Sequence, residues 1–191
     1  METAKSKFGR LDVSVNCAGT ACAYDTYNFN KDRPHMLEDF SRLMTVNTVG
    51  TFNVIRLAAQ MMAKNEPNSD GQRGVIINTS SYAAYDGQRG QAAYSASNAG
   101  IVGMTLPIAR EFSSEGIRVV TIVPGLFDTP MCVGNLLEEV EEFLTETVLF
   151  PQRLGHPKEY AELVQSIVEN PLINGTSIRL DGGFRSFPFV S

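Results

Sequence analysis

Two hydroxyl side chains, Ser81 and Tyr94, are the residues of this sequence best placed for proton-transfer chemistry. Ser81 follows a short apolar run that predicts a buried strand, and Tyr94 falls in the first turns of the helix expected next. In open α/β sheets, ligands bind outside the carboxyl ends of the strands. The spacing of 13 residues therefore predicts that both hydroxyls lie on one side of a cleft.

Polar and glycine residues also follow two other predicted strands, at residues 16–19 and 124–129. Taken singly, each segment is typical of an ordinary strand-to-helix turn, since such turns favour Ser, Asn and Gly whatever the function. The carboxyl ends of parallel strands meet at one edge of a sheet, so the segments together favour a ligand site at that edge.

The elements that must position these residues alternate along the chain. Runs of apolar and β-branched residues predict strands at residues 11–16, 75–77, 117–123 and 177–180. Apolar positions at helical spacing predict helices at about 37–64, 92–112, 136–145 and 157–169, with a polar loop at 65–74. Alternation of this kind is typical of βαβ units, so we expect one α/β domain over residues 1–191, with a parallel sheet covered by helices on both faces.

Composition restricts the class of protein. The chain has 191 residues, of which 43% are apolar and 19% are charged, as in an ordinary globular domain. Its net charge of −5 argues against a broad nucleic-acid surface. No run approaches the roughly 18 apolar residues of a membrane-spanning helix, so we expect no membrane segment. Three cysteines, Cys17, Cys22 and Cys132, are too few for a disulfide framework and favour a reducing compartment.

The residues around Tyr94 resemble a known family. Residues 94–98, Tyr-Ser-Ala-Ser-Asn, are similar to the Tyr-x-x-x-Lys signature of the short-chain dehydrogenases, with Ser81 at its usual place upstream. Residues 16–19, Asn-Cys-Ala-Gly, resemble the family's Asn-Asn-Ala-Gly turn. Asn47 corresponds to its helical asparagine and Pro124-Gly125 to its Pro-Gly turn, and the similarity extends over residues 8–185.

The resemblance implies a Rossmann-like, doubly wound fold and an NAD-linked oxidation of a secondary alcohol, either a 3-hydroxyacyl-CoA or a hydroxysteroid. In that scheme Tyr94, as a phenolate, takes the alcohol proton, Ser81 hydrogen-bonds the substrate oxygen, and Asn47 holds a water in a proton relay. Without the resemblance, Asn47 is better interpreted as a solvated helix residue. The resemblance places ten residues at the cofactor: Asn16, Cys17, Ala18, Gly19, Tyr94, Asn98, Pro124, Gly125, Phe127 and Thr129.

Two departures from the family pattern lower the expected activity. Asn98 stands where the family has a lysine that holds the nicotinamide ribose and favours the ionised tyrosine. An asparagine supplies no charge, so we expect the rate to fall by roughly two to three orders of magnitude. In addition, no glycine-rich phosphate loop precedes Asn16. We therefore expect this chain to form the C-terminal two-thirds of the family's fold, without its N-terminal strands. The sheet should then have about four strands, with residues 11–16 at its edge.

Three functions remain open. The first is the dehydrogenase, favoured by Ser81, Tyr94 and Asn47, and the second is a non-catalytic binding or structural subunit, favoured by Asn98 and by the missing glycine-rich loop. Family members form homo-oligomers, and one is mitochondrial and assists a tRNA methyltransferase, so the resemblance implies such partners and that location although no targeting segment is visible. A hydrolase with Ser81 as nucleophile is weak, because His35 and His156 are distant in the sequence. No spacing of His, Cys or acidic residues predicts a metal site. The apolar loop at 126–149 suits an acyl chain or a steroid.

Overall fold

The computed structural model describes residues 2–133 and 145–185. Its elements, in chain order, are α1 (Glu2–Phe8), β1 (Val13–Asn16), β2 (Tyr27–Asn28), β3 (Arg33–Pro34), α2 (Leu37–Leu43), η1 (Met44–Val49), α3 (Gly50–Met62), β4 (Gly74–Thr79), α4 (Ala83–Asp86), α5 (Ala92–Glu111), η2 (Ser113–Glu115), β5 (Ile117–Pro124), α6 (Pro130–Val133), α8 (Pro157–Glu169) and β6 (Ser177–Leu180).

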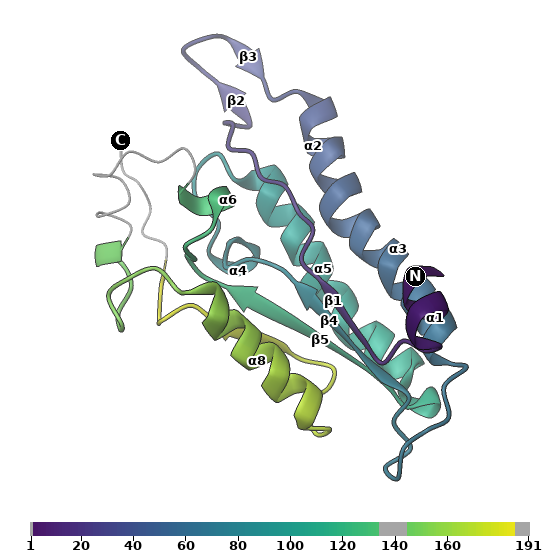
Figure 1. The fold of residues 1–191 in the computed structure, drawn as a ribbon. Helices are drawn as coiled ribbons and strands as arrows, with labels where there is room; N and C mark the ends of the chain where they lie inside the picture. Colours follow the sequence, from purple (N-terminus) through teal and green to yellow (C-terminus); the bar gives the residue numbers. More distant parts are fainter. Residues whose placement is uncertain (1, 134–144, 186–191) are drawn as a thin grey trace.

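The main sheet has four parallel strands in the order β1-β4-β5-β6 (Figure 1). Val13 pairs with Val75, Ile77 with Val120 and Val123 with Arg179. Strands β4 and β5 are buried along almost their whole length, as expected for central strands covered on both faces. The predicted parallel sheet of four strands is confirmed, and so is its α/β class.

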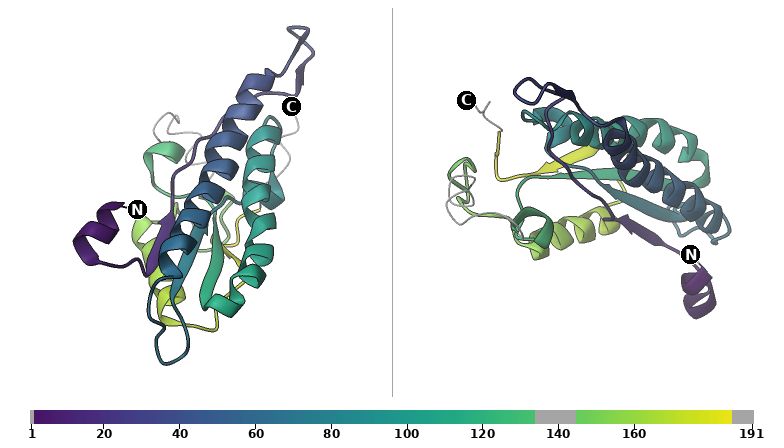
Figure 2. Two further views of the ribbon diagram at one scale, coloured as in Figure 1. Left: turned by 90° about the vertical axis from the view of Figure 1, so that its right-hand side faces the viewer. Right: turned by 90° about the horizontal axis from the view of Figure 1, so that it is seen from above.

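Helices cover both faces of this sheet, which the view from above shows as three layers (Figure 2). Ile55 and Met62 of α3 pack with Ile108 of α5 against one face. On the opposite face, Ile167 of α8 packs against Val75, Ile77, Val120 and Ile122. Helix α5 presents a buried stripe at helical spacing, with Ala93, Ser97, Ile101, Thr105 and Ile108.

The predicted helix at 37–64 is a succession of three helical segments that ends at Met62. Between α2 and α3 the chain forms a π-helical segment, η1, in which Asn47 is buried. Helices α1, α4 and α6 were not predicted from the sequence, and neither was the β2–β3 hairpin, which projects from the body of the molecule (Figure 1). The predicted helix at 136–145 lies almost wholly outside the described residues.

Candidate functional site

The structure brings Ser81 and Tyr94 into neighbouring segments. Ser81 follows β4 and is 5% exposed, and its hydroxyl accepts a hydrogen bond from the Ala83 N–H at 3.2 Å as α4 begins. Helix α4 packs on α5, which carries the partly buried Tyr94. The Tyr94 ring packs against a buried cluster formed by Tyr82, Ala83, Val148 and Phe184, called the Tyr82–Phe184 cluster below.

Asn47 is a junction between three segments, and the solvated interpretation is excluded because it is only 3% exposed. Its Oδ1 accepts a hydrogen bond from the Thr20 N–H at 2.9 Å. Its Nδ2 donates to the Thr20 carbonyl at 2.9 Å and to the Ser97 hydroxyl at 3.0 Å. The amide thus connects η1 to the turn after β1 and to α5, one turn of helix from Tyr94.

Asn98 turns inward to its own helix. Its Nδ2 donates to the Tyr94 carbonyl at 3.0 Å, and its own carbonyl accepts from the Ser80 hydroxyl at 3.0 Å. The residue is 4% exposed. Its amide nitrogen therefore supports the helix that carries Tyr94 and places no charge beside the phenol.

The carboxyl ends of β1 and β4 carry a second polar cluster. Asn16 Nδ2 donates to Asn78 Oδ1 at 2.8 Å, and the Thr79 hydroxyl lies 2.6 Å from the Tyr160 hydroxyl of α8 and 3.6 Å from Cys17 Sγ. Burial raises the pKa of Tyr160, so its phenol remains neutral and hydrogen-bonded. Residues Cys17, Ala18 and Gly19 are exposed beside this cluster.

The Pro-Gly turn after β5 is built against the turn after β6. The Gly125 N–H donates to the Leu180 carbonyl at 2.9 Å, and a Cβ at Gly125 would lie only 2.7 Å from Asp181 Cβ. The Phe127 ring is turned toward Gly155 and meets Tyr160 edge-on with centroids 6.4 Å apart. Thr129 donates to the Phe127 carbonyl at 3.5 Å. Close packing therefore accounts for glycine at position 125.

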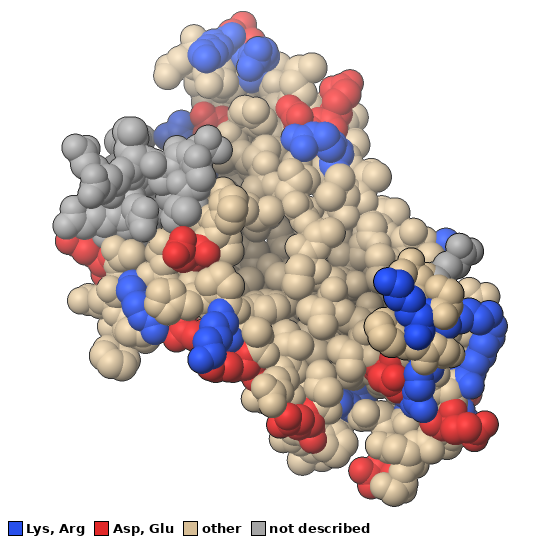
Figure 3. All heavy atoms as spheres, viewed as in Figure 1, with Lys and Arg blue, Asp and Glu red and all other residues tan. Residues whose placement is uncertain are grey.

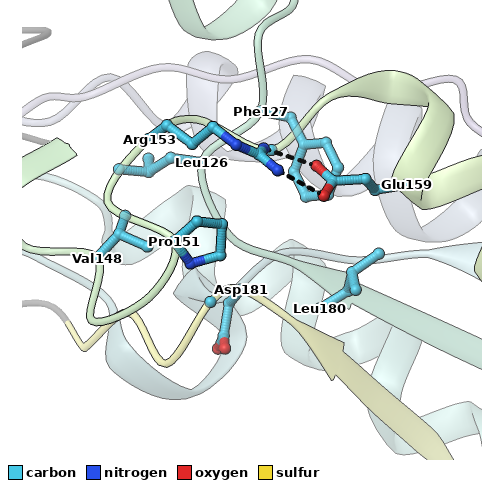
Figure 4. Close-up of a pocket in the computed structure, with 10 residues that line it drawn as sticks. Leu126, Phe127, Val148, Pro151, Arg153, Glu159, Leu180 and Asp181 are labelled. Carbon is cyan, nitrogen blue, oxygen red and sulfur yellow. Dashed lines mark hydrogen bonds and ion pairs between the residues drawn. The ribbon is translucent and has the colours of Figure 1, made fainter.

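A pocket of about 190 Å³ lies beside this turn (Figure 4). Arg153 and Glu159 form a two-pronged ion pair on one wall, at 2.8 and 2.9 Å, and the Asp181 carboxylate points away from them. The pocket is lined by Leu126, Phe127, Val148, Pro151, Arg153, Gly155, Glu159, Leu180, Asp181 and Gly182. Neither Ser81 nor Tyr94 is among them, but the pocket shares Val148 with the Tyr82–Phe184 cluster, against which Tyr94 also packs.

The remaining candidate groups have other partners or positions. His156 is exposed and forms the N-cap of α8, and His35 lies by Tyr24 with ring centroids 5.9 Å apart. The Ser81 hydroxyl is hydrogen-bonded to the Ala83 N–H, and among the described residues no hydrogen bond joins it to either histidine. Cys17, Cys22 and Cys132 form no disulfide bonds with one another. Within residues 2–133 and 145–185, no group of three or more His, Cys, Asp and Glu side chains could hold a metal ion. The same residues contain no helix long and apolar enough to cross a membrane.

Several residues around the expected reaction centre were not predicted from the sequence. Tyr82 and Phe184 form its apolar wall, with their rings edge-on and centroids 4.8 Å apart. Arg179 binds Asp86 and Asp181 at 2.6 Å each, which ties α4 to the end of β6. In the sequence, Arg179 stands two residues before Asp181, but nothing there connects it with Asp86.

Fold and site together define a class of protein, and the comparisons agree. A family model described as enoyl-(acyl carrier protein) reductase matches residues 1–185. The chain belongs to the short-chain dehydrogenase/reductase family. Within it, the chain is close to 3-hydroxyacyl-CoA dehydrogenase type-2, as the relatives show.

The Drosophila melanogaster protein of that name is 65% identical over 188 residues, which are 98% of this chain and 73% of the relative. The human protein is 63% identical over 185 residues, 97% of this chain and 70% of the relative. The crystal structure of the Mycobacterium avium type-2 enzyme is 38% identical and superposes with a TM-score of 0.91, covering 97% of this chain and 72% of that one.

Members of this family are typically NAD(P)-dependent, and the site fits such a cofactor in part. Residues 17–19 are exposed, and the small residues Ala18 and Gly19 suit a close approach of a cofactor. Asn78 Nδ2, beside Asn16, is a buried nitrogen with no hydrogen-bond partner among the described residues. Asn98 does not fit, because its amide is bonded to Tyr94 and is not presented to a ribose.

Proposed function

We propose that this chain is a short-chain oxidoreductase for a secondary alcohol, with NAD as cofactor and a 3-hydroxyacyl-CoA as substrate. The observation that carries the proposal is the β4–α4–α5 arrangement, which places Ser81 and Tyr94 in packed neighbouring segments. The names of the two relatives above favour the acyl-CoA over a hydroxysteroid. By the same resemblance we propose a homo-oligomer and a mitochondrial location.

The residues divide the reaction between them. Tyr94, as a phenolate, accepts the proton of the substrate alcohol, and Ser81 donates a hydrogen bond to its oxygen. Asn47, fixed by three hydrogen bonds, sets the backbone that holds the relay water. Residues 16–19, with Pro124, Gly125, Phe127 and Thr129, would hold the cofactor, Phe127 through its backbone because its ring faces Gly155. When bound, the nicotinamide ring supplies the hydride acceptor.

Asn98 limits the rate in this proposal. A lysine ammonium about 4 Å from a phenol favours its phenolate by roughly 4 kcal/mol at an effective dielectric of about 20. The inward-turned amide of Asn98 provides none of this stabilisation. The same observation supports a second function, in which the chain is a non-catalytic binding or structural subunit, for example with a tRNA methyltransferase.

A lysine at position 98 separates these functions. We expect Asn98→Lys to raise the rate of NAD-dependent oxidation of a 3-hydroxyacyl-CoA by roughly 100- to 1000-fold over the unchanged chain. Asn98→Gln is the matched control, because it lengthens the side chain without adding charge, and it should leave the rate unchanged. Calorimetric titration with NAD⁺ and NADH accompanies the assay. If no form binds cofactor at millimolar concentration, the oxidoreductase proposal is wrong and the binding-protein function stands.

A further inference from the structure

An ion-pair cluster centred on Arg179 joins two segments that flank the reaction centre. Arg179 lies in β6, and its side chain is 24% exposed. Its guanidinium donates to Asp86 Oδ2 through Nη2 and to Asp181 Oδ2 through Nε, both at 2.6 Å, and its Cζ lies 5.6 Å from the centroid of the Tyr85 ring. One cation therefore holds the last residue of α4 and the turn that follows β6.

The first of these segments begins at Ser81. The Ser81 carbonyl accepts from the Ala84 N–H at 2.9 Å, and the Tyr82 carbonyl accepts from the Asp86 N–H at 2.9 Å. Helix α4 has only four residues, too few to be stable without tertiary contacts. Its position, and with it the direction of the Ser81 hydroxyl, depends on what holds its ends.

The second segment forms the wall beside Tyr94. The Asp181 side chain is 8% exposed and also accepts from the Gly183 N–H at 3.0 Å, and the Asp181 carbonyl accepts from the Phe184 N–H at 2.9 Å. Phe184 is 1% exposed and packs edge-on against Tyr82, the residue after Ser81. Arg179 thus closes a ring of contacts from Ser81 through α4, Asp181 and Phe184 back to Tyr82.

We infer that Arg179 is a positioning residue for the Ser81–Tyr94 site, acting through α4 on one side and the Asp181–Phe184 turn on the other. The inference rests on the proposed function for its catalytic consequence. A guanidinium can bind two carboxylates in different directions through fixed, separate N–H groups, whereas a lysine ammonium is a point charge on a flexible stem. The geometry therefore calls for arginine and not merely for positive charge.

The holding role is tested by amide hydrogen exchange in the full chain. Arg179→Met keeps the apolar stem and removes the ion pairs, and we expect exchange in residues 81–87 to rise about tenfold or more, relative to β5. Arg185→Met is the matched control, because Arg185 also contacts Asp181, at 3.1 Å, but is 58% exposed and does not reach α4. The Arg185→Met substitution should leave amide exchange in residues 81–87 unchanged. A uniform rise throughout the chain, or none at 81–87, overturns the inference.

The positioning role is tested by kinetics in the Asn98→Lys background. We expect Arg179→Met to lower kcat about 10- to 100-fold while KM for NAD changes little, since displacement of a reacting group by about 1 Å costs that much. Arg179→Lys should restore part of kcat. Asp86→Asn, with Arg179 unchanged, should also lower kcat, and it tests the inference if the Arg179→Met chain does not fold. A folded Arg179→Met chain with full kcat contradicts the inference. If the Asn98→Lys chain is itself inactive, the proposed function is refuted and not the inference about Arg179. Hydrogen exchange then still decides whether Arg179 holds α4.

Discussion

Two buried asparagines show how the same side chain serves different ends at the scale of a residue. The Asn98 amide donates within one helix, to the carbonyl of Tyr94. The Asn47 amide forms hydrogen bonds to other segments, with Thr20 and Ser97, so that η1, the turn after β1 and α5 are held at one point. Loss of a side chain that joins segments leaves buried partners without hydrogen bonds, and each such bond contributes about 1 kcal/mol net.

Asn47→Ala should therefore lower the free energy of unfolding by roughly 2–4 kcal/mol, because three hydrogen bonds are lost and the Thr20 and Ser97 groups remain. Urea denaturation followed by circular dichroism measures this difference. Asn53→Ala is the control, since the exposed Asn53 side chain accepts from Arg56 on the same helix, at 2.9 Å, and its loss should cost less than about 0.5 kcal/mol. Equal effects of the two substitutions would show that Asn47 is not a junction.

Which residues could be found from sequence depends on how their partners are separated. The motif around Tyr94, the apolar run before Ser81 and the turn at 16–19 are local patterns, so their place at the carboxyl edge of the sheet followed from strand order. The partners Arg179 and Asp86 lie 93 residues apart, and no local pattern connects them. The rotamer of Asn98 is likewise set by a helix carbonyl that competes with the cleft for its amide, which spacing alone does not decide.

At the scale of elements, α8 shows how completely a helix start can be encoded locally. Its predicted bounds of 157–169 are confirmed, with Pro157 at the first turn and His156 and Glu159 forming a capping box. The segment at 37–64 was harder, since apolar spacing near 3.6 residues does not register the extra residue of a π-helical turn. The hairpin β2–β3 has strands of two residues, too short for alternation to be detected.

At low pH, Glu159 should stabilise the N-terminus of α8 less than it does near neutral pH. The Arg153 guanidinium, and then the His156 backbone N–H, lower the pKa of Glu159 from 4.5 to about 2. A carboxyl whose pKa is lower in the folded state stabilises that state above about pH 4.5, and the effect is lost as pH falls through about 2. Glu159→Gln should thus be less stable than the unchanged chain at pH 6, and the difference between them should shrink at pH 3.

Thermal unfolding of both chains at the two pH values measures this difference. Glu162→Gln is a suitable comparison, because the Glu162 carboxylate makes an exposed contact with Lys158 at 3.7 Å, and its effect should vary less with pH. A Glu159→Gln deficit that is as large at pH 3 as at pH 6 would contradict the ion pair as its origin.

At the scale of the whole molecule, the layers leave one side of the sheet open. Among the described residues, no strand pairs with the outer side of β1, and Val15 on that strand is 40% exposed. Charged side chains lie mostly around the border of the face that contains β1, whose middle carries few (Figure 3). An uncharged edge strand with free N–H and C=O groups is a template for pairing with another chain.

We therefore expect the isolated chain to self-associate through β1, and a lysine on this strand to suppress the association. Lysine on an edge strand opposes edge-to-edge pairing because the incoming strand would have to desolvate its charge. Val15→Lys should lower the weight-average mass in sedimentation experiments toward the monomer's and leave the urea midpoint nearly unchanged, since Val15 is partly exposed. Ser114→Lys adds the same charge at an exposed position beyond α5 and should leave association as it was. If both lysines reduce association equally, net charge and not the β1 edge controls it.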